Sequence, residues 1–72
     1  MTLTWDASYA VARELRRLHP AEDLATVSLG QIQAWTIALP DFEDDPALAN
    51  DEVLYAIYQD WFEEQLDDNR IA

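Results

Sequence analysis

The chain has 72 residues, no cysteine, and 15 acidic against four basic side chains, which give a formal net charge of −11. The lack of cysteine excludes disulfides, thiolate metal sites and cysteine nucleophiles. Half of the residues are apolar and 11% are aromatic, a composition too apolar for a disordered acidic tail. No apolar run approaches the roughly 20 residues that span a bilayer, and the first residues lack the pattern of a secretory signal. We therefore expect a small folded domain in the cytoplasm, without membrane contact.

The charge is unevenly distributed along the chain. Residues 1–30 carry four acidic side chains and three arginines, whereas residues 31–72 carry eleven acidic side chains and one arginine. Such a field repels nucleic-acid phosphates and anionic membranes, and it attracts cations and basic protein surfaces. An acidic balance alone would only keep a small protein soluble. Its concentration in one half of the chain favours a binding face.

The first predicted helix runs from about Asp6 to Leu18. Its buried stripe is expected at Val11, Leu15 and Leu18, which follow i, i+4, i+7 spacing. The side chain of Asp6 or Thr4 is expected to cap the first turn, because Asp and Thr accept hydrogen bonds from the free N–H groups there.

A loop follows, in which Thr26–Val27 is expected to be extended and to pair with Leu3–Trp5 as a minimal β element. Ser28 and Gln31 have the spacing of a capping box, in which each side chain accepts from the other residue's backbone N–H. The box predicts a second helix from Ser28 to about Leu39. Its buried residues are expected to be Ile32, Trp35 and Leu39.

The third predicted helix is the longest and ends at about Leu66. Two starts fit the sequence equally well: Asp45 as the cap with Pro46 as first residue, or Asn50 as the cap. Its buried stripe is expected to consist of Leu54, Ile57 and Trp61, flanked by Val53 and Tyr58. Together these elements predict a mostly α, three-helix monomer with one domain over residues 1–66 and a flexible tail over 67–72. No cofactor is needed for it to fold.

Four carboxylates gather between the second and third helices, at Asp41, Glu43, Asp44 and Asp45. Phe42 is expected to turn inward and leave them in solvent. Oxygen ligands of this kind suit hard ions such as Ca²⁺, Mg²⁺, Mn²⁺ or iron. The alternative is a solvated loop whose charges only cap and flank the next helix.

An EF-hand calcium loop is excluded, although its spacing is partly matched. Asp41, Glu43, Asp45 and Glu52 occupy positions 1, 3, 5 and 12 of such a loop. The sixth position requires glycine for a sharp turn, but it is Pro46 here, whose φ is fixed near −65°.

Further acids follow along the third helix, where Asp60 and Glu64 form a like-charged i, i+4 pair that destabilises a helix slightly. Because no lysine is interleaved, this face is expected to meet a positive partner. The charge argument adds five residues to the partner-binding face: Asp51, Glu52, Asp60, Glu63 and Glu64.

Catalysis finds no support in the sequence. His19 is the only histidine, and Ser8 and Ser28 have no His/Asp arrangement that would activate a hydroxyl. A single glycine, Gly30, excludes a glycine-rich phosphate loop. We therefore expect no catalytic or cofactor-binding residues.

A wider pattern covers about residues 3–65. It consists of Trp5, Leu18-His19-Pro20, Thr26-Val27, Trp35, Leu39, the segment Asp41–Pro46, Asn50, Leu54, Ala56-Ile57, Trp61 and Glu64. Through this pattern the chain resembles the IscX-type iron–sulfur cluster assembly proteins. The D-F-x-D-D-P segment, followed by Asn and by L-x-A-I-x-x-x-W, is its most specific part. The departures are Pro40 before the motif and the tail beyond Gln65.

The resemblance implies a modified winged-helix-like fold and an accessory role, as an adaptor or regulator that binds the cysteine desulfurase and contacts other cluster-assembly proteins. It also implies weak binding of Fe²⁺ or Fe³⁺ by surface carboxylates. Both iron binding and partner contact are carried over to the four residues that match the acidic motif: Asp41, Glu43, Asp44 and Asp45.

Two other functions remain open at this point. One is an iron-buffering protein that acts without a partner. The other is a winged-helix nucleic-acid binder, for which only Arg13, Arg16 and Arg17 could supply a basic patch. Strong binders make roughly 6–10 phosphate contacts, so three arginines predict no nucleic-acid partner.

Overall fold

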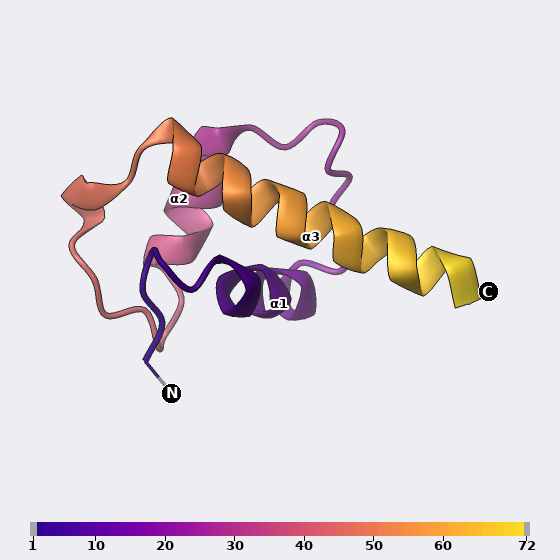
Figure 1. The fold of residues 1–72 in the computed structure, drawn as a ribbon, viewed down its shortest axis with the longest axis horizontal. Helices are drawn as coiled ribbons and strands as arrows, with labels where there is room; N and C mark the ends of the chain where they lie inside the picture. The colour runs from indigo at the N-terminus through magenta and orange to yellow at the C-terminus, as the bar shows by residue number, and fades with distance from the viewer. Residues whose placement is uncertain (1, 72) are drawn as a thin grey trace.

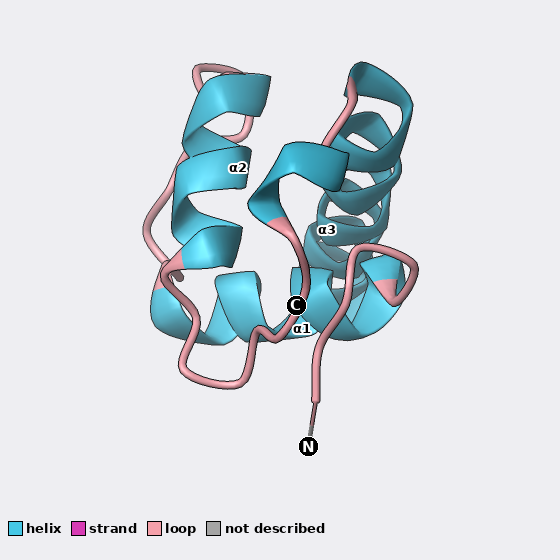
Figure 2. Cartoon of the chain, turned by 90° about the vertical axis from the view of Figure 1, so that its left-hand side faces the viewer, coloured by secondary structure: helices cyan, strands magenta, loops and turns pink. Residues whose placement is uncertain are grey.

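The computed structural model describes residues 2–71, and the side chains of residues 2–66. Its elements are α1 (Ser8–Leu18), α2 (Leu29–Ile37), the short 3₁₀ turn η1 (Pro46–Leu48) and α3 (Asp51–Ile71). The long helix α3 packs on both α1 and α2, and its C-terminal turns extend beyond them (Figure 1). Seen from the end of the molecule that carries the loop between α2 and α3, α2 and α3 stand side by side and α1 lies below them (Figure 2). The expected mostly α, three-helix fold is confirmed.

The core forms where the three helices meet. The predicted stripe of α3 is confirmed, since Leu54, Ile57 and Trp61 are all buried. From α1, Val11 and Leu15 are buried as expected, together with Ala12. Leu18 was expected in the core, but its exposed fraction is 44%. The buried face of α1 is turned toward Ala12, so Leu18 lies at its edge in the last turn of the helix.

The start of α1 differs from the prediction. The helix begins at Ser8 with Ala7 as its N-cap residue, and no side-chain cap is found among the described residues. Neither Asp6 nor Thr4 caps it, because the backbone turns just before the helix. In that turn the N–H of Ala7 donates to the carbonyl oxygen of Thr4 at 3.0 Å.

The capping box of α2 is confirmed in both directions. The N–H of Ser28 donates to Gln31 Oε1 at 2.9 Å, and the N–H of Gln31 donates to Ser28 Oγ at 3.1 Å. The helix ends at Ile37, two residues before the expected end. Ile32 and Leu39 are buried as predicted, whereas Trp35 is only partly buried. Its ring stacks on His19, with ring centroids 4.4 Å apart, so His19 lies in a packed position.

The β element is a single parallel bridge between Leu3 and Phe42. The expected pairing of Leu3–Trp5 with Thr26–Val27 is therefore wrong. Thr26 and Val27 close a local turn instead, in which their N–H groups donate to the carbonyls of Asp23 and Leu24. The expectation of at most a minimal β element is confirmed, and the winged-helix likeness stays a prediction.

Both candidate caps before α3 are used. Asp45 Oδ1 accepts from the N–H of Ala47 at 2.9 Å and caps η1. Asn50 Oδ1 accepts from the N–H of Val53 at 2.9 Å at the start of α3. The backbone of α3 continues through Ile71, so the expected end at Leu66 is wrong. The predicted flexibility of residues 67–72 lies outside the described side chains. In the described part, no helix is long and apolar enough to cross a membrane.

Candidate functional site

The acidic loop at 41–45 is held by the N-terminal segment of the chain. The N–H of Leu3 donates to the Asp41 carbonyl at 2.8 Å, and the Leu3 carbonyl accepts from the N–H of Glu43 at 2.9 Å. The indole Nε1–H of Trp5 donates to the Asp45 carbonyl at 2.9 Å. Phe42 turns inward as predicted and packs edge-on against Trp5, with ring centroids 4.8 Å apart. These bonds fix the backbone that presents the carboxylates.

Two of the four loop carboxylates also stabilise the local backbone. Asp44 is half-buried, and its oxygens accept from the backbone N–H groups of Trp5 at 3.0 Å and Asp45 at 2.8 Å. Asp45 is exposed, with one oxygen capping η1. Asp41 and Glu43 are exposed, and Glu43 Oε2 accepts only an exposed bond from Thr2 Oγ1 at 3.2 Å. The loop therefore contains one partly buried carboxylate, Asp44, and three exposed ones, of which Asp45 also caps η1.

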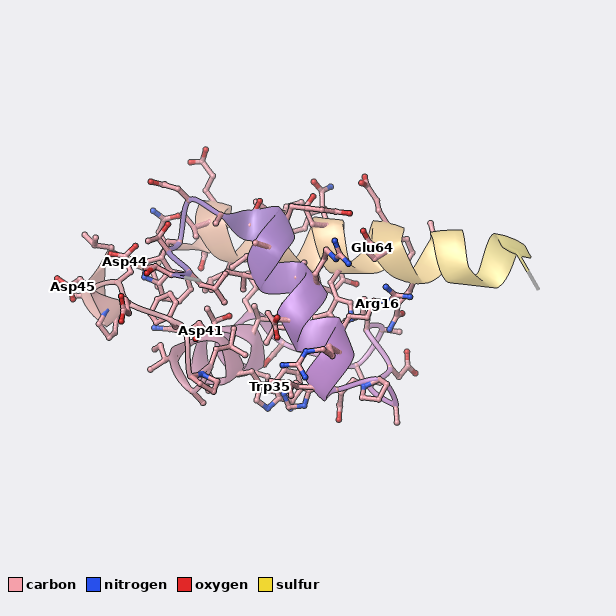
Figure 3. The ribbon with its side chains drawn as sticks, turned by 90° about the horizontal axis from the view of Figure 1, so that it is seen from below. Arg16, Trp35, Asp41, Asp44, Asp45 and Glu64 are labelled. Carbon is pink, nitrogen blue, oxygen red and sulfur yellow. The ribbon has the colours of Figure 1, made fainter. Side chains whose placement is uncertain are left out.

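The four loop acids do not form a ready-made metal centre. Within the described part of the chain, no group of three or more Asp, Glu and His side chains is placed to hold one ion. Figure 3 shows Asp44 and Asp45 together at one end of the molecule, with Asp41 apart from them. An ion at this loop would be held by one or two carboxylates and by water, as in weak sites for hard cations. A dedicated iron-buffering site gains no support from this geometry.

The acids of α3 divide between two faces of the helix. Asp60 and Glu64 face α1. Asp60 Oδ2 accepts from Ser8 Oγ at 2.7 Å. Glu64 Oε2 is paired with Arg16 Nη1 at 3.3 Å, and Figure 3 shows these two side chains close together. Both acids are partly buried, so their carboxylates help to join the two helices. This contact inside the fold was not foreseen for either residue.

Six of the nine predicted partner-binding acids are exposed, and we call them the exposed acids. They are Asp41, Glu43, Asp45, Asp51, Glu52 and Glu63. Three lie in the loop, two in the first turn of α3, and one further along that helix. The loop and the start of α3 thus form a carboxylate-rich surface. Asp44, Asp60 and Glu64 were predicted to belong to the binding face, but they are partly buried and bonded within the fold.

The arginines of α1 lie along a surface hollow of about 620 Å³, which is also lined by Leu3, Tyr9 and Asp41. Arg17 donates to Glu14 at 2.7 and 3.0 Å, and Arg16 is paired with Glu64. Much of the positive charge is therefore balanced within the fold. The expectation of no nucleic-acid partner stays a prediction.

One exposed feature was missed in the sequence. Tyr55 and Phe62 have exposed fractions of 53% and 44% on the outside of α3, and Tyr58 lies between them. Their spacing of i, i+3, i+7 is a second apolar pattern on the helix. It was overlooked because the neighbouring stripe of buried residues already accounts for the core.

The fold and its surface define a small, acidic, three-helix domain. A family model described as iron–sulphur cluster assembly matches residues 3–66. The uncharacterised protein PA3808 of Pseudomonas aeruginosa is 34% identical over 65 residues, which cover 90% of this chain and 98% of that protein. The chain therefore belongs to the IscX-type iron–sulfur cluster assembly family, and the resemblance seen in the sequence is confirmed.

Proposed function

We propose that the chain is a cytoplasmic accessory protein of iron–sulfur cluster assembly that binds the cysteine desulfurase through its exposed acids. It acts as a monomeric adaptor or regulator of sulfur supply, by binding and not by catalysis. The observation that carries the proposal is the charge of one continuous stretch. Residues 31–66 contain nine acidic side chains and no basic one, and six of those acids are exposed.

The physical basis is electrostatic complementarity. A surface of one sign raises the rate at which an oppositely charged partner finds it, and it disfavours partners of the same sign. The bonds that Leu3 and Trp5 make with the loop backbone keep the loop acids in place before binding. Less ordering is then required when the complex forms. This supports a docking surface at the loop and the first turn of α3.

Weak iron binding is the second part of the proposal. Exposed carboxylates are suitable donors for Fe²⁺ and Fe³⁺, and Asp41, Glu43 and Asp45 are the exposed acids of the loop. Asp44 is a poorer donor because two backbone N–H groups already bind its oxygens. We expect low affinity, because the four side chains do not converge on a shared position.

Titration with purified desulfurase at low and high ionic strength tests the proposal. Binding should weaken markedly with salt, since exposed charges are screened beyond about 8–10 Å at physiological ionic strength. The E52Q/E63Q variant should bind more weakly than an E14Q/E22Q variant, which changes the net charge equally but in residues 1–30. Absent binding, or binding that is insensitive to both salt and E52Q/E63Q, would refute the electrostatic account.

A further inference from the structure

Three aromatic rings stack along the outside of α3, and we call Tyr55, Tyr58 and Phe62 the aromatic ladder. The rings of Tyr55 and Tyr58 lie 6.1 Å apart at 16°, and those of Tyr58 and Phe62 lie 6.4 Å apart at 12°. The hydroxyl of Tyr58 donates to the Leu24 carbonyl at 3.2 Å, which anchors the middle ring to the fold. The outer two rings are about half exposed.

Only the two outer rings of the ladder, Tyr55 and Phe62, lie outside the core, because Tyr58 is partly buried and packs against it. Each ladder residue comes directly after a buried residue in the sequence. The buried residues are Leu54, Ile57 and Trp61, which form the stripe that faces α1 and α2. Helix α3 thus carries a second apolar stripe beside the buried one, and the two outer rings of this second stripe are exposed. Single exposed apolar residues are ordinary, but a row of stacked rings is typical of an interaction surface.

Carboxylates border the rings. A shallow hollow of about 240 Å³ is lined by Tyr55, Tyr58, Gln59, Phe62 and Glu63. Glu63 is exposed beside the last ring, and Glu52 is exposed one helical turn before Tyr55. A ligand in the hollow would therefore meet flat ring surfaces and negative charges together.

We propose that the aromatic ladder anchors the protein partner, and that its occupant is an arginine-bearing segment of that partner. A guanidinium group stacks on an aromatic ring and pairs with a carboxylate at the same time, while its methylene stem packs on apolar surface. Aromatic residues bordered by polar groups are also frequent hot spots of protein interfaces. The inference rests on the proposed function for a basic partner, and it adds a specific anchor that charge alone does not provide.

The ladder predicts a salt-resistant component of binding. Contacts between exposed charges weaken with ionic strength, whereas the packing of rings against a partner changes much less. Truncation of both outer rings should therefore weaken desulfurase binding about tenfold or more, at low and at high salt. Tyr58 is left intact because its bond to Leu24 belongs to the fold.

The test uses the full chain and compares Y55A/F62A with Y55F, which keeps the ring, and with L18A, which removes a similarly exposed apolar side chain of α1, away from the proposed docking surface. Unfolding midpoints from tryptophan fluorescence show that each variant is folded. Loss of binding in Y55A/F62A alone supports the anchor. Binding of Y55A/F62A equal to that of the natural chain overturns it and leaves the proposed function intact.

Two further measurements separate the remaining outcomes. If the natural chain does not bind the desulfurase, the proposed function fails. Titration with an octa-arginine peptide then tests separately whether the aromatic ladder binds arginine side chains. A tenfold weaker peptide affinity of Y55A/F62A at high salt supports it, and an unchanged affinity overturns it. Sedimentation of the chain alone tests self-association: a dimer that Y55A/F62A dissociates would make a second copy the occupant and overturn the proposal.

Discussion

The backbone N–H of Trp5 donates a hydrogen bond to the carboxylate of Asp44 at 3.0 Å, across 39 positions of sequence. Trp5 is buried, with an exposed fraction of 3%, so this carboxylate secures the loop to the core. Asp44 lies in the most acidic segment of the chain, yet it serves the fold. Partner binding should therefore be tested at the exposed acids beside it, and a loss of binding on mutation of Asp44 could reflect a loss of structure.

Replacing Asp44 with alanine should lower the free energy of unfolding by about 2 kcal/mol. The substitution leaves the part-buried N–H of Trp5 without its acceptor, and such a loss costs about 1–3 kcal/mol, whereas the exposed N–H of Asp45 can bond to water. Urea denaturation followed by tryptophan fluorescence measures the change. Glu43→Ala in the same loop is the control and should cost much less, because its bond to Thr2 is exposed. Equal losses in the two variants would contradict the structural role of Asp44.

Asn50→Ala should destabilise the start of α3 by about 1 kcal/mol, the usual cost of losing an N-cap side chain. The loss follows from the bond that Asn50 Oδ1 accepts from Val53. Asn50→Asp should retain the stability, since its carboxylate can accept the same bond. Thermal unfolding monitored by circular dichroism makes the comparison. A similar loss in the two variants would show that the cap is not the cause.

The Arg16–Glu64 pair should contribute only about 0.5 kcal/mol, because both side chains are partly exposed to water and salt. Arg16 takes part in further interactions, so R16A alone overestimates the pair. A double-mutant cycle with R16A, E64A and the combined variant isolates the pair, and its coupling energy should shrink at high salt. A coupling of several kcal/mol that salt does not change would indicate a buried ion pair instead.

Thr36→Val should raise stability by about 1 kcal/mol. The Thr36 hydroxyl is fully buried, and among the described residues no hydrogen-bond partner lies within reach of it. Valine has nearly the same shape and removes the cost of burying that group. Thr36→Ser is the matched control: it keeps the hydroxyl, loses a methyl group, and should lower stability. A destabilised T36V variant would mean that the hydroxyl is bonded in solution.

Local features of the structure could be predicted from the sequence. The capping box at Ser28 and Gln31 and the cap at Asn50 depend on residues three positions apart, and the buried stripe at Leu54, Ile57 and Trp61 depends on helical periodicity. Each is decided within a few turns of one element, where spacing alone fixes which groups meet.

Contacts between distant segments could not be predicted in this way. The bridge between Leu3 and Phe42 and the bond between Ser8 and Asp60 join residues about 40 and 50 positions apart. Periodicity does not say which helix face meets which neighbour. For that reason the acids of α3 were assigned to one binding face, although Asp60 and Glu64 turn toward α1.

The most direct test of the central claim is a map of backbone amides perturbed in the ¹⁵N-labelled chain when unlabelled cysteine desulfurase is added. The account predicts shifted or broadened signals at Glu43, Asp45, Glu52 and Glu63, with little change at Arg13 and Arg17 on α1. Perturbations confined to those arginines, with the loop and the outer face of α3 unchanged in the complex, would contradict it.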